Sequence, residues 1–247
     1  DVFHFVALKN YIKMFKDHVF WTSVVNNLIF FVGTVFIQAL LGFVLAVLLK
    51  KKLPGSNVFK AIYFMPIAMA TSIITAIFRI IMDPTNGALN QFLRAIHLNG
   101  FAVNWLGDPK IALVSVIIVN IFQWMGFSMI TYYAGLMSLP DDVYEAAKID
   151  GASAIQTFFK ITVPLLKPTI LLTAIMSTNG TLQLFDESIN LTDGGPANAS
   201  ISMSHYIYNL CFKYVPNFGY AAAMSFFILL LVAVLALIQM RVGDKRD

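Results

Sequence analysis

Residues 19–49 read VFWTSVVNNLIFFVGTVFIQALLGFVLAVLL, with no Asp, Glu, Lys or Arg among them. A helix of about 20 apolar residues crosses the roughly 30 Å hydrocarbon core of a bilayer, so this run is long enough to span a membrane. Further intervals without those charged residues cover 61–78, 111–140, 168–185 and 214–240. We predict an all-α fold, a transmembrane helical bundle with spans at approximately 19–49, 59–82, 111–137, 165–186 and 217–240.

The composition of the whole chain agrees with a membrane protein. Of its 247 residues, 58% are hydrophobic and 12% are charged, and the mean hydropathy is +0.75. One soluble core cannot cover so much apolar surface, so lipid must cover the rest. The net charge of +4 does not indicate nucleic-acid binding, because the basic residues lie at the ends of the apolar intervals. The single cysteine, Cys211, excludes an intrachain disulfide. We predict one transmembrane domain over residues 1–247.

The distribution of basic residues predicts how the spans are oriented. Alternating spans place ten of them on one side, namely Lys50, Lys51, Lys52, Lys60, Lys148, Lys160, Lys167, Arg241, Lys245 and Arg246. Seven lie on the other side, namely Lys9, Lys13, Lys16, Arg79, Arg94, Lys110 and Lys213. The positive-inside rule therefore places the first side and the C-terminus in the cytoplasm. Five spans then leave the N-terminus outside, so we expect a sixth helix upstream of Asp1.

The segment 138–164 reads SLPDDVYEAAKIDGASAIQTFFKITVP. Its helix-capping and helix-breaking residues predict two short helices in a cytoplasmic loop. Ser138 with Asp141 fits a capping box for the first helix. Gly151 suits the C′ position that ends this helix. A helix of about three turns is marginal unless it packs against something. Helical spacing places on one side Val143, Ala146, Ala147 and Asp150, whose small members would admit a partner surface.

The second helix of this loop has its own start and stop signals. Ser153 with Gln156 forms a capping box, and Pro164 is expected to end the helix near the membrane. A well-capped surface loop without a partner would show the same pattern. Capping predicts the geometry of the loop and leaves its purpose open.

Polar side chains inside the third and fourth intervals are candidates for a substrate path, because each needs a partner away from lipid. They are Asn120, Gln123 and Trp124 beside Gly126, and Ser177, Thr178, Asn179, Thr181 and Gln183 around Gly180. Amide and hydroxyl groups pair with sugar hydroxyls, and an aromatic face stacks on a pyranose ring. Hydrogen bonds between helices would explain the same residues equally well.

Charged residues flank the outer ends of two spans. Arg79 and Asp83 are four residues apart and could pair, and Asp186 with Glu187 closes the outer end of the fourth span. We interpret them as interface anchors rather than as a charge pathway. A secondary transporter or channel, the alternative class, would need ionisable residues inside its spans. The five intervals contain none.

Catalytic and ATP-binding motifs do not occur in the sequence. A phosphate-binding loop needs a Gly-Lys dipeptide, and the chain has none, nor a Gly-x-Ser-x-Gly or a HExxH motif. The histidines are expected to be solvated in outer segments; they are His4, His18, His97 and His205. We therefore predict a transporter subunit rather than an enzyme, with no metal and no cofactor of its own, and with ATP handled by another chain.

Several stretches resemble a known family. Glu145-Ala-Ala-Lys-Ile-Asp-Gly151, followed by Ile161-Thr-Val-Pro164, resembles the EAA loop of ABC importer permeases. Other stretches are similar to the carbohydrate branch of that family, the maltose-transporter type. They are Leu8-Lys-Asn-Tyr11, Asp17 to Trp21, Asn104-Trp-Leu-Gly-Asp108, and Phe185-Asp186 through Leu191-Thr-Asp-Gly-Gly-Pro196. The resemblance covers nearly the whole chain.

The resemblance implies a six-helix permease of the type I importer kind, in the cytoplasmic membrane of a prokaryote, that moves a sugar or oligosaccharide. Its partners would be a second homologous permease, two copies of a cytoplasmic ATPase holding ATP and Mg, and an extracytoplasmic solute-binding protein. The EAA helix would be the coupling helix, seated in a cleft of the ATPase. Glu145 would face a basic group there, Ala146 and Ala147 would allow close packing beside Asp150, and Gly151 would turn the chain.

The resemblance also implies a sugar site built from the third and fourth spans. The matching residues are Met125, Gly126, Met129, Ser177, Gly180, Thr181 and Leu184. Their chemistry adds Asn120, Gln123, Trp124, Asn179 and Gln183 to the expected substrate path. Glycerol phosphate or another polar solute is an alternative cargo. A phosphate would require inward-facing Arg or Lys, which these spans lack.

Overall fold

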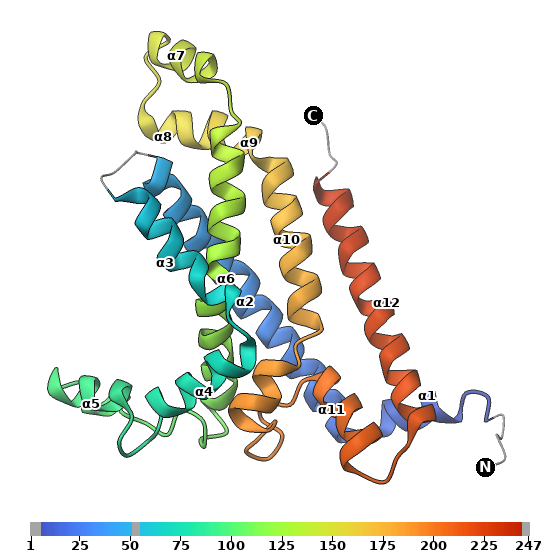
Figure 1. Cartoon of the computed structure of the whole chain (residues 1–247). Coiled ribbons are helices and arrows are strands. Elements are labelled where there is room, and N and C mark those ends of the chain that lie inside the picture. The colour runs from blue at the N-terminus through green and yellow to red at the C-terminus, as the bar shows by residue number, and fades with distance from the viewer. Residues whose placement is uncertain (1–5, 51–54, 244–247) are drawn as a thin grey trace.

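The computed structural model describes residues 6–50 and 55–243. Within those ranges every regular element is a helix, so the predicted all-α fold is confirmed (Figure 1). Helices meet the demand that lipid imposes, because they satisfy their backbone hydrogen bonds internally. The expectations for His4, Lys51, Lys52, Lys245 and Arg246 fall outside the described residues.

Three of the helices are long and apolar enough to cross a membrane. They are α2 (His18–Lys50), α6 (Ala112–Met137) and α12 (Phe218–Gly243). They lie where the sequence predicts spans at 19–49, 111–137 and 217–240. Two bent pairs of helices, each long enough if taken as one span, occupy the positions of the other two.

The first bent pair breaks the predicted span 59–82. It consists of α3 (Ser56–Ala68) and α4 (Thr71–Ile81), whose axes differ by 101°. The two residues between them adopt extended backbone conformations. Gln123 of α6 donates a hydrogen bond from Nε2 to Thr71 Oγ1 at 3.0 Å. An amide of the central helix therefore holds the start of α4 at the bend.

The second bent pair joins the loop to the fourth span. The helical run Ala154–Leu165, which ends in α9 (Val163–Leu165), meets α10 (Lys167–Leu182) at 63°. α10 ends before the predicted limit of 186. Asn27 of α2 accounts for this end, because its Nδ2 donates to Leu182 O at 2.9 Å and its Oδ1 accepts the Met203 N–H at 2.9 Å.

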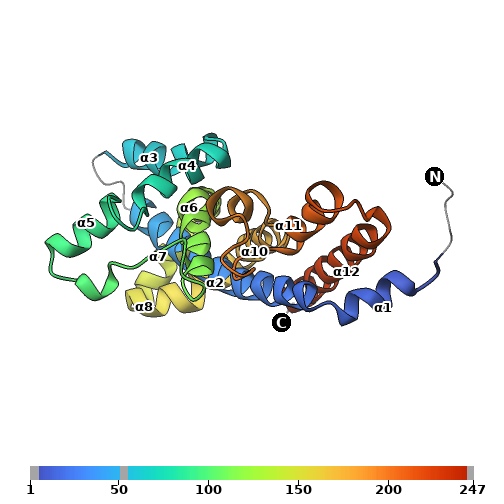
Figure 2. The ribbon, with the colours of Figure 1, turned by 90° about the horizontal axis from the view of Figure 1, so that it is seen from below.

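The helices divide the molecule into two ends (Figure 1). At one end lie α7 (Asp141–Ile149), α8 (Ala154–Thr157), η2 (Phe158–Thr162) and the end of α12. At the other lie α1 (Lys9–Lys16), α5 (Ala88–Ala95), η1 (Asn99–Phe101), η3 (Ser188–Thr192), α11 (Met203–Tyr208) and η4 (Asn209–Lys213). Figure 2 shows α2 running along the molecule beneath α6 and α10.

The contact between α2 and α6 uses small and polar residues. A Cβ atom added to Gly42 would lie 2.7 Å from the Cβ of Ser128, so only glycine allows this approach. Gln38 of α2 donates from Nε2 to Ser128 Oγ at 3.1 Å and to Trp124 O at 3.2 Å. Close backbones and buried amides are the usual means by which helices associate in lipid. α6 is accordingly the most buried of the three long helices.

The expected pair between Arg79 and Asp83 is wrong. α4 ends at Ile81, so Asp83 lies beyond the helix and not one turn from Arg79. Its Oδ1 instead accepts the backbone N–H groups of Thr85 at 3.0 Å and Asn86 at 2.7 Å. The aspartate shapes the turn before α5.

Asp17, directly before α2, joins four helices at the end of the molecule opposite α7. Its Oδ2 accepts the hydroxyls of Tyr206 in α11 and Tyr220 in α12, both at 2.6 Å. Its Oδ1 accepts the N–H groups of Val19 and Phe20 at the start of α2. Burial alone would raise the pKa of Asp17, but these hydrogen bonds together hold it below its usual value.

Replacing Asp17 by asparagine is expected to lower the free energy of unfolding by about 1–2 kcal/mol at pH 7, because hydrogen bonds to a charged acceptor are lost. A lowered pKa means that the ionised carboxylate stabilises the fold above the unfolded pKa of about 4, and that this stabilisation is lost as the pH falls through the folded pKa. The two proteins should therefore converge in acid.

Denaturation in detergent at pH 7 and in a series down to pH 2 measures this difference. Asp108→Asn is the matched control, because the Asp108 carboxylate accepts only the exposed N–H of Lys110. We expect a change of less than about 0.5 kcal/mol for the control. An Asp17 variant that is as stable as the unaltered chain at pH 7 would contradict the prediction.

Candidate transport pocket and coupling loop

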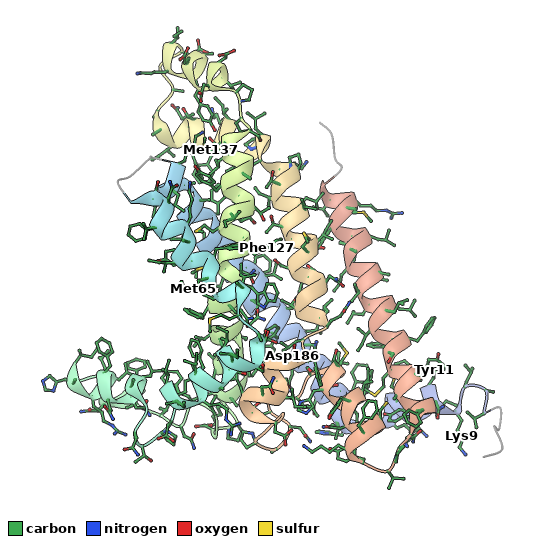
Figure 3. The ribbon with its side chains drawn as sticks, viewed as in Figure 1. Lys9, Tyr11, Met65, Phe127, Met137 and Asp186 are labelled. Atoms are coloured by element: carbon green, nitrogen blue, oxygen red, sulfur yellow. The ribbon has the colours of Figure 1, made fainter. Side chains whose placement is uncertain are left out.

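A cavity of about 330 Å³ lies between α6 and the last turns of α10. Its walls come from four helices and from the segment that follows α10. The lining residues are Gln38, Thr71, Asn120, Trp124, Phe127, Met176, Ser177, Gly180, Thr181, Gln183, Leu184, Phe185, Asp186 and Glu187. Figure 3 labels Phe127 on α6 and Asp186 on the segment after α10. We refer to this cavity as the transport pocket.

Most of the predicted substrate path lines the transport pocket. The residues that do are Asn120, Trp124, Ser177, Gly180, Thr181, Gln183 and Leu184. Gln38 and Thr71 were not foreseen, because they come from spans where single polar residues gave no pattern. The aromatic side chains of Phe127 and Phe185 were missed for a different reason. Aromatic residues in a membrane helix are common and carry no signal of their own.

The other predicted path residues have structural roles. Gln123 holds the α3–α4 bend, and Met129 is fully buried. Met125 packs against a hydrophobic cluster between α2, α4 and α6. A Cβ on Gly126 would overlap the carbonyl oxygen of Tyr63 in α3, so this glycine serves helix packing. None of these four residues is among those that line the transport pocket.

Asn179 also lies outside the lining of the transport pocket, but it supports a residue that is part of it. Its Oδ1 accepts a hydrogen bond from Gln183 Nε2 at 2.7 Å. Thr178, one position earlier, accepts a hydrogen bond from Gln239 of α12 at 2.6 Å. For Thr178 and Gln123 the alternative of hydrogen bonding between helices therefore describes the polar residue correctly.

Glu187 is the largest departure from the sequence expectations. It was interpreted as an anchor at the outer end of the fourth span, but it is only 6% exposed and lines the transport pocket. Its Oε1 accepts a hydrogen bond from Asn120 Nδ2 at 2.5 Å. The physical reason is that α10 ends early and the chain turns back against α6, which carries the carboxylate inward.

The mixture of groups in the transport pocket suits a polyhydroxyl ligand. Ser177, Thr71 and Gln183 supply hydroxyl and amide groups, and the Trp124 and Phe127 rings supply faces for stacking. None of the lining residues is Lys, Arg or His. This pocket is therefore equipped for hydrogen bonding and stacking and not for binding an anion.

The loop at the opposite end begins with α7, which ends as predicted. Gly151 has φ +73°, and the N–H of Ala152 reaches back to Ala147 O at 3.0 Å. This is the Schellman arrangement, in which glycine takes the left-handed conformation at C′. The predicted C′ position of Gly151 is confirmed.

The rest of the loop holds α7 in place. The Lys50 ammonium lies 4.2 Å above the Tyr144 ring, and the Tyr144 hydroxyl is 3.2 Å from Thr162 Oγ1 in η2. Ala147 is 5% exposed, so the structure does not place it on an exposed, partner-facing surface. The exposed residues of the same loop include Glu145, Ala146 and Asp150.

Two of the predicted start and stop signals in this loop differ from the structure. α6 continues to Met137, so Ser138 lies at its end, and the hydroxyl donates to Gly135 O instead of capping α7. The capping box of Ser153 with Gln156 is confirmed. Pro164 does not end the second helix, because it lies in the first turn of α9, where no N–H is needed.

His205 is buried, and its expected exposure to solvent is wrong. Its Nδ1 lies 3.0 Å from Ser188 Oγ, and its Nε2 lies 3.5 Å from Asp193 Oδ1. This order of contacts is that of a Ser-His-Asp triad. Neither Ser188 nor His205 has exposed surface, and Ser188 Oγ donates to Ser200 O at 2.8 Å, so no substrate reaches the serine. Burial lowers the pKa of His205 and favours the neutral ring.

Across residues 6–50 and 55–243, no three His, Cys, Asp or Glu side chains gather as metal ligands would.

Comparison with known proteins identifies the family. The profile of the family described as "Binding-protein-dependent transport system inner membrane component" matches residues 38–246. The lactose transport system permease protein LacF of Rhizobium radiobacter is 41% identical, over 98% of this chain and 82% of its own length. The trehalose/maltose transport system permease protein MalF of Thermococcus litoralis is 33% identical, over 98% of this chain and 81% of its own length.

A solved structure shares the fold. It is a bacterial alginate ABC transporter in complex with an alginate pentasaccharide-bound periplasmic protein, matched at a TM-score of 0.87 and 23% identity over 97% of this chain and 83% of that chain. The relatives are named as transport permeases, which agrees with the prediction of a transporter rather than an enzyme. With a profile match across most of its length, and relatives above 30% identity along nearly all of it, this chain belongs to the binding-protein-dependent transport system inner membrane components.

Proposed function

We propose that this chain is the permease subunit of an ATP-driven ABC importer and that it moves a sugar or oligosaccharide through the transport pocket. The observation that carries the proposal is the pocket itself, in which hydroxyls, amides and aromatic faces converge between α6 and α10. The names of the relatives that transport lactose, trehalose and maltose support the same class of cargo. The expected substrate-path residues that line the pocket would contact the sugar.

We infer that α7 is the coupling helix and that its end of the molecule, with the C-terminus, faces the cytoplasm. Glu145, Ala146 and Asp150 would contact a cleft of the ATPase, and Gly151 would set the turn behind them. Ile149 is 86% exposed on the same helix, a large apolar side chain without cover. Displacement of α7 would reach α2 through Lys50 and Tyr144, and would reach α10 through η2 and α9.

The remaining partners would be a second permease, two copies of the ATPase carrying ATP and Mg, and an extracytoplasmic binding protein. Two long helices leave room for the second permease. Of the most apolar window in α2 and in α12, only 28% and 22% of residues are buried, against 56% in α6. Lipid and the second permease would share these open faces.

An alternative cargo is glycerol phosphate or another anionic solute. The transport pocket has no basic side chain to meet a phosphate, so the sugar is favoured. A transporter that works without ATP is the other alternative. It would use a chain of ionisable groups across the membrane, whereas Glu187 is hydrogen-bonded to the neutral amide of Asn120.

Uptake of labelled lactose and maltose into proteoliposomes tests the proposal. Transport by the complete complex should require ATP inside and the binding protein outside. Trp124→Ala should reduce uptake about tenfold, since an aromatic stacking face worth roughly 1.4 kcal/mol is lost. Phe59→Ala is the matched control, because Phe59 is 52% exposed on α3 and does not line the pocket. ATP-independent uptake, or full uptake by the Trp124 variant, would contradict the proposal.

A further inference from the structure

The charged side chains that line the transport pocket are all acidic. Asp186 and Glu187 both line it, and no lining residue is Lys, Arg or His. The ion pairs between described side chains, Lys213–Asp193 and the longer His205–Asp193 contact, do not include them. Among the residues that the structure describes, no cation therefore pairs with either carboxylate.

The two carboxylates occupy different positions in the pocket wall. Asp186 is exposed, so water reaches its carboxylate. Glu187 is buried against α6, and this burial raises the pKa of its carboxyl group, while the hydrogen bond that the Asn120 amide donates to it acts in the opposite direction. The helix ends at the pocket offset one another, because the C-terminal end of α10 carries partial negative charge and the N-terminal end of α4, at Thr71, carries partial positive charge.

This arrangement acts differently on neutral and on anionic ligands. Carboxylate oxygens accept hydrogen bonds from sugar hydroxyls, and such charge-assisted bonds are among the stronger ones. A carboxylate or phosphate on the ligand meets like charge inside a partly desolvated pocket, where charges are poorly screened. We propose that Asp186 and Glu187 make the transport pocket select uncharged saccharides and reject carboxylated or phosphorylated ones. The inference rests on the proposed sugar permease function.

The reactivity of a thiol toward charged reagents measures the electrostatic potential in the pocket, and this measurement does not require the sugar to be identified. Ser177 lines the pocket, and Ser177→Cys, with Cys211→Ser and no other cysteine in the complex, places a single thiol there. The complex in nanodiscs is reacted with the cationic thiosulfonate MTSET and the anionic MTSES. The quantity compared is the rate of reaction with MTSET divided by the rate with MTSES. This ratio should be about tenfold or more higher for the Ser177→Cys thiol than for free 2-mercaptoethanol.

Asp186→Asn with Glu187→Gln should reduce that preference at least about threefold, while the glutamine oxygen can still accept from Asn120. Met137→Cys is the matched control, because Met137 is 50% exposed at the far end of α6 and outside the pocket. Its rate ratio should not change with the double substitution. A ratio near that of the free thiol at Ser177→Cys, or one that the double substitution leaves unaltered, would overturn the proposal.

Lactose and lactose 6-phosphate separate this inference from the proposed function. Two results together support the charge selection and the sugar permease function. Lactose should quench Trp124 fluorescence in the unaltered complex, and lactose 6-phosphate should quench it only after the double substitution. Trp124→Phe identifies the signal of that residue. Equal binding of the two ligands in the unaltered complex overturns the charge selection and leaves the sugar permease standing. Binding of neither, with no ATP-driven uptake of lactose or maltose, overturns both.

Discussion

Replacing Gly126 by alanine is expected to destabilise the helical bundle strongly. The added Cβ would overlap the carbonyl oxygen of Tyr63, because α3 lies directly against α6 at this position. Both clashing groups belong to helix backbones, so neither can move aside by a side-chain rotation. Overpacking costs about 1–3 kcal/mol, and more where backbones must separate. We expect the thermal midpoint of the complex in detergent to fall by about 10 °C, with a lower yield of folded protein.

Gly180→Ala is the matched control for this experiment. Gly180 also lies inside a membrane helix, but an added Cβ would have no atom within 4 Å. Alanine favours helix over glycine by about 1 kcal/mol, so the control should be as stable as the unaltered chain or more stable. A Gly126 variant with an unchanged midpoint would mean that α3 does not pack on α6 as described.

Glu145→Lys should abolish sugar-stimulated ATP hydrolysis, with a loss of tenfold or more. Glu145 is exposed on α7, and the proposed partner surface presents a basic group to it. Reversing the charge replaces an attraction by a repulsion at an interface, and like charges there cost several kcal/mol. Stimulation by the sugar-loaded binding protein, measured on the reconstituted complex, gives the readout.

Two controls separate uncoupling from misfolding. Glu145→Gln keeps the shape and loses only the charge, so its activity should lie between those of the unaltered and lysine forms. Lactose binding at Trp124 should be unchanged in both variants, because the transport pocket and α7 lie apart and share no residue. Normal sugar-stimulated hydrolysis in the lysine variant would sink the assignment of α7 as the coupling helix.

Local patterns predicted the features that depend only on local geometry. The Schellman end at Gly151 and the capping box of Ser153 each involve a few consecutive residues, and both are present. Ser138 failed for a non-local reason. Ser138 lies between α6 and α7, and its hydroxyl could bond to either helix. Because α6 extends to Met137, the hydroxyl donates to Gly135 O of α6.

The transport pocket was predicted in part, because polar residues within an apolar helix can be recognised in the sequence. Asn120 and Thr181 stand out for that reason, and both line the pocket. Glu187 did not, since an acid at the end of an apolar run is expected to face water. Only the early end of α10, at Leu182, brings it inside.

The apolar runs, together with the residues that cap and break them, predicted a helical membrane protein, its family resemblance and the short helices of the segment 138–164. These features follow from length, apolar composition and local capping. Tertiary structure decided where the spans break, which glycines serve close packing and which side chains share the transport pocket. Those outcomes depend on contacts between residues far apart in the chain, such as Gln123 with Thr71 and Asn27 with Leu182. No local pattern encodes such contacts, because each is set by the mutual packing of several helices.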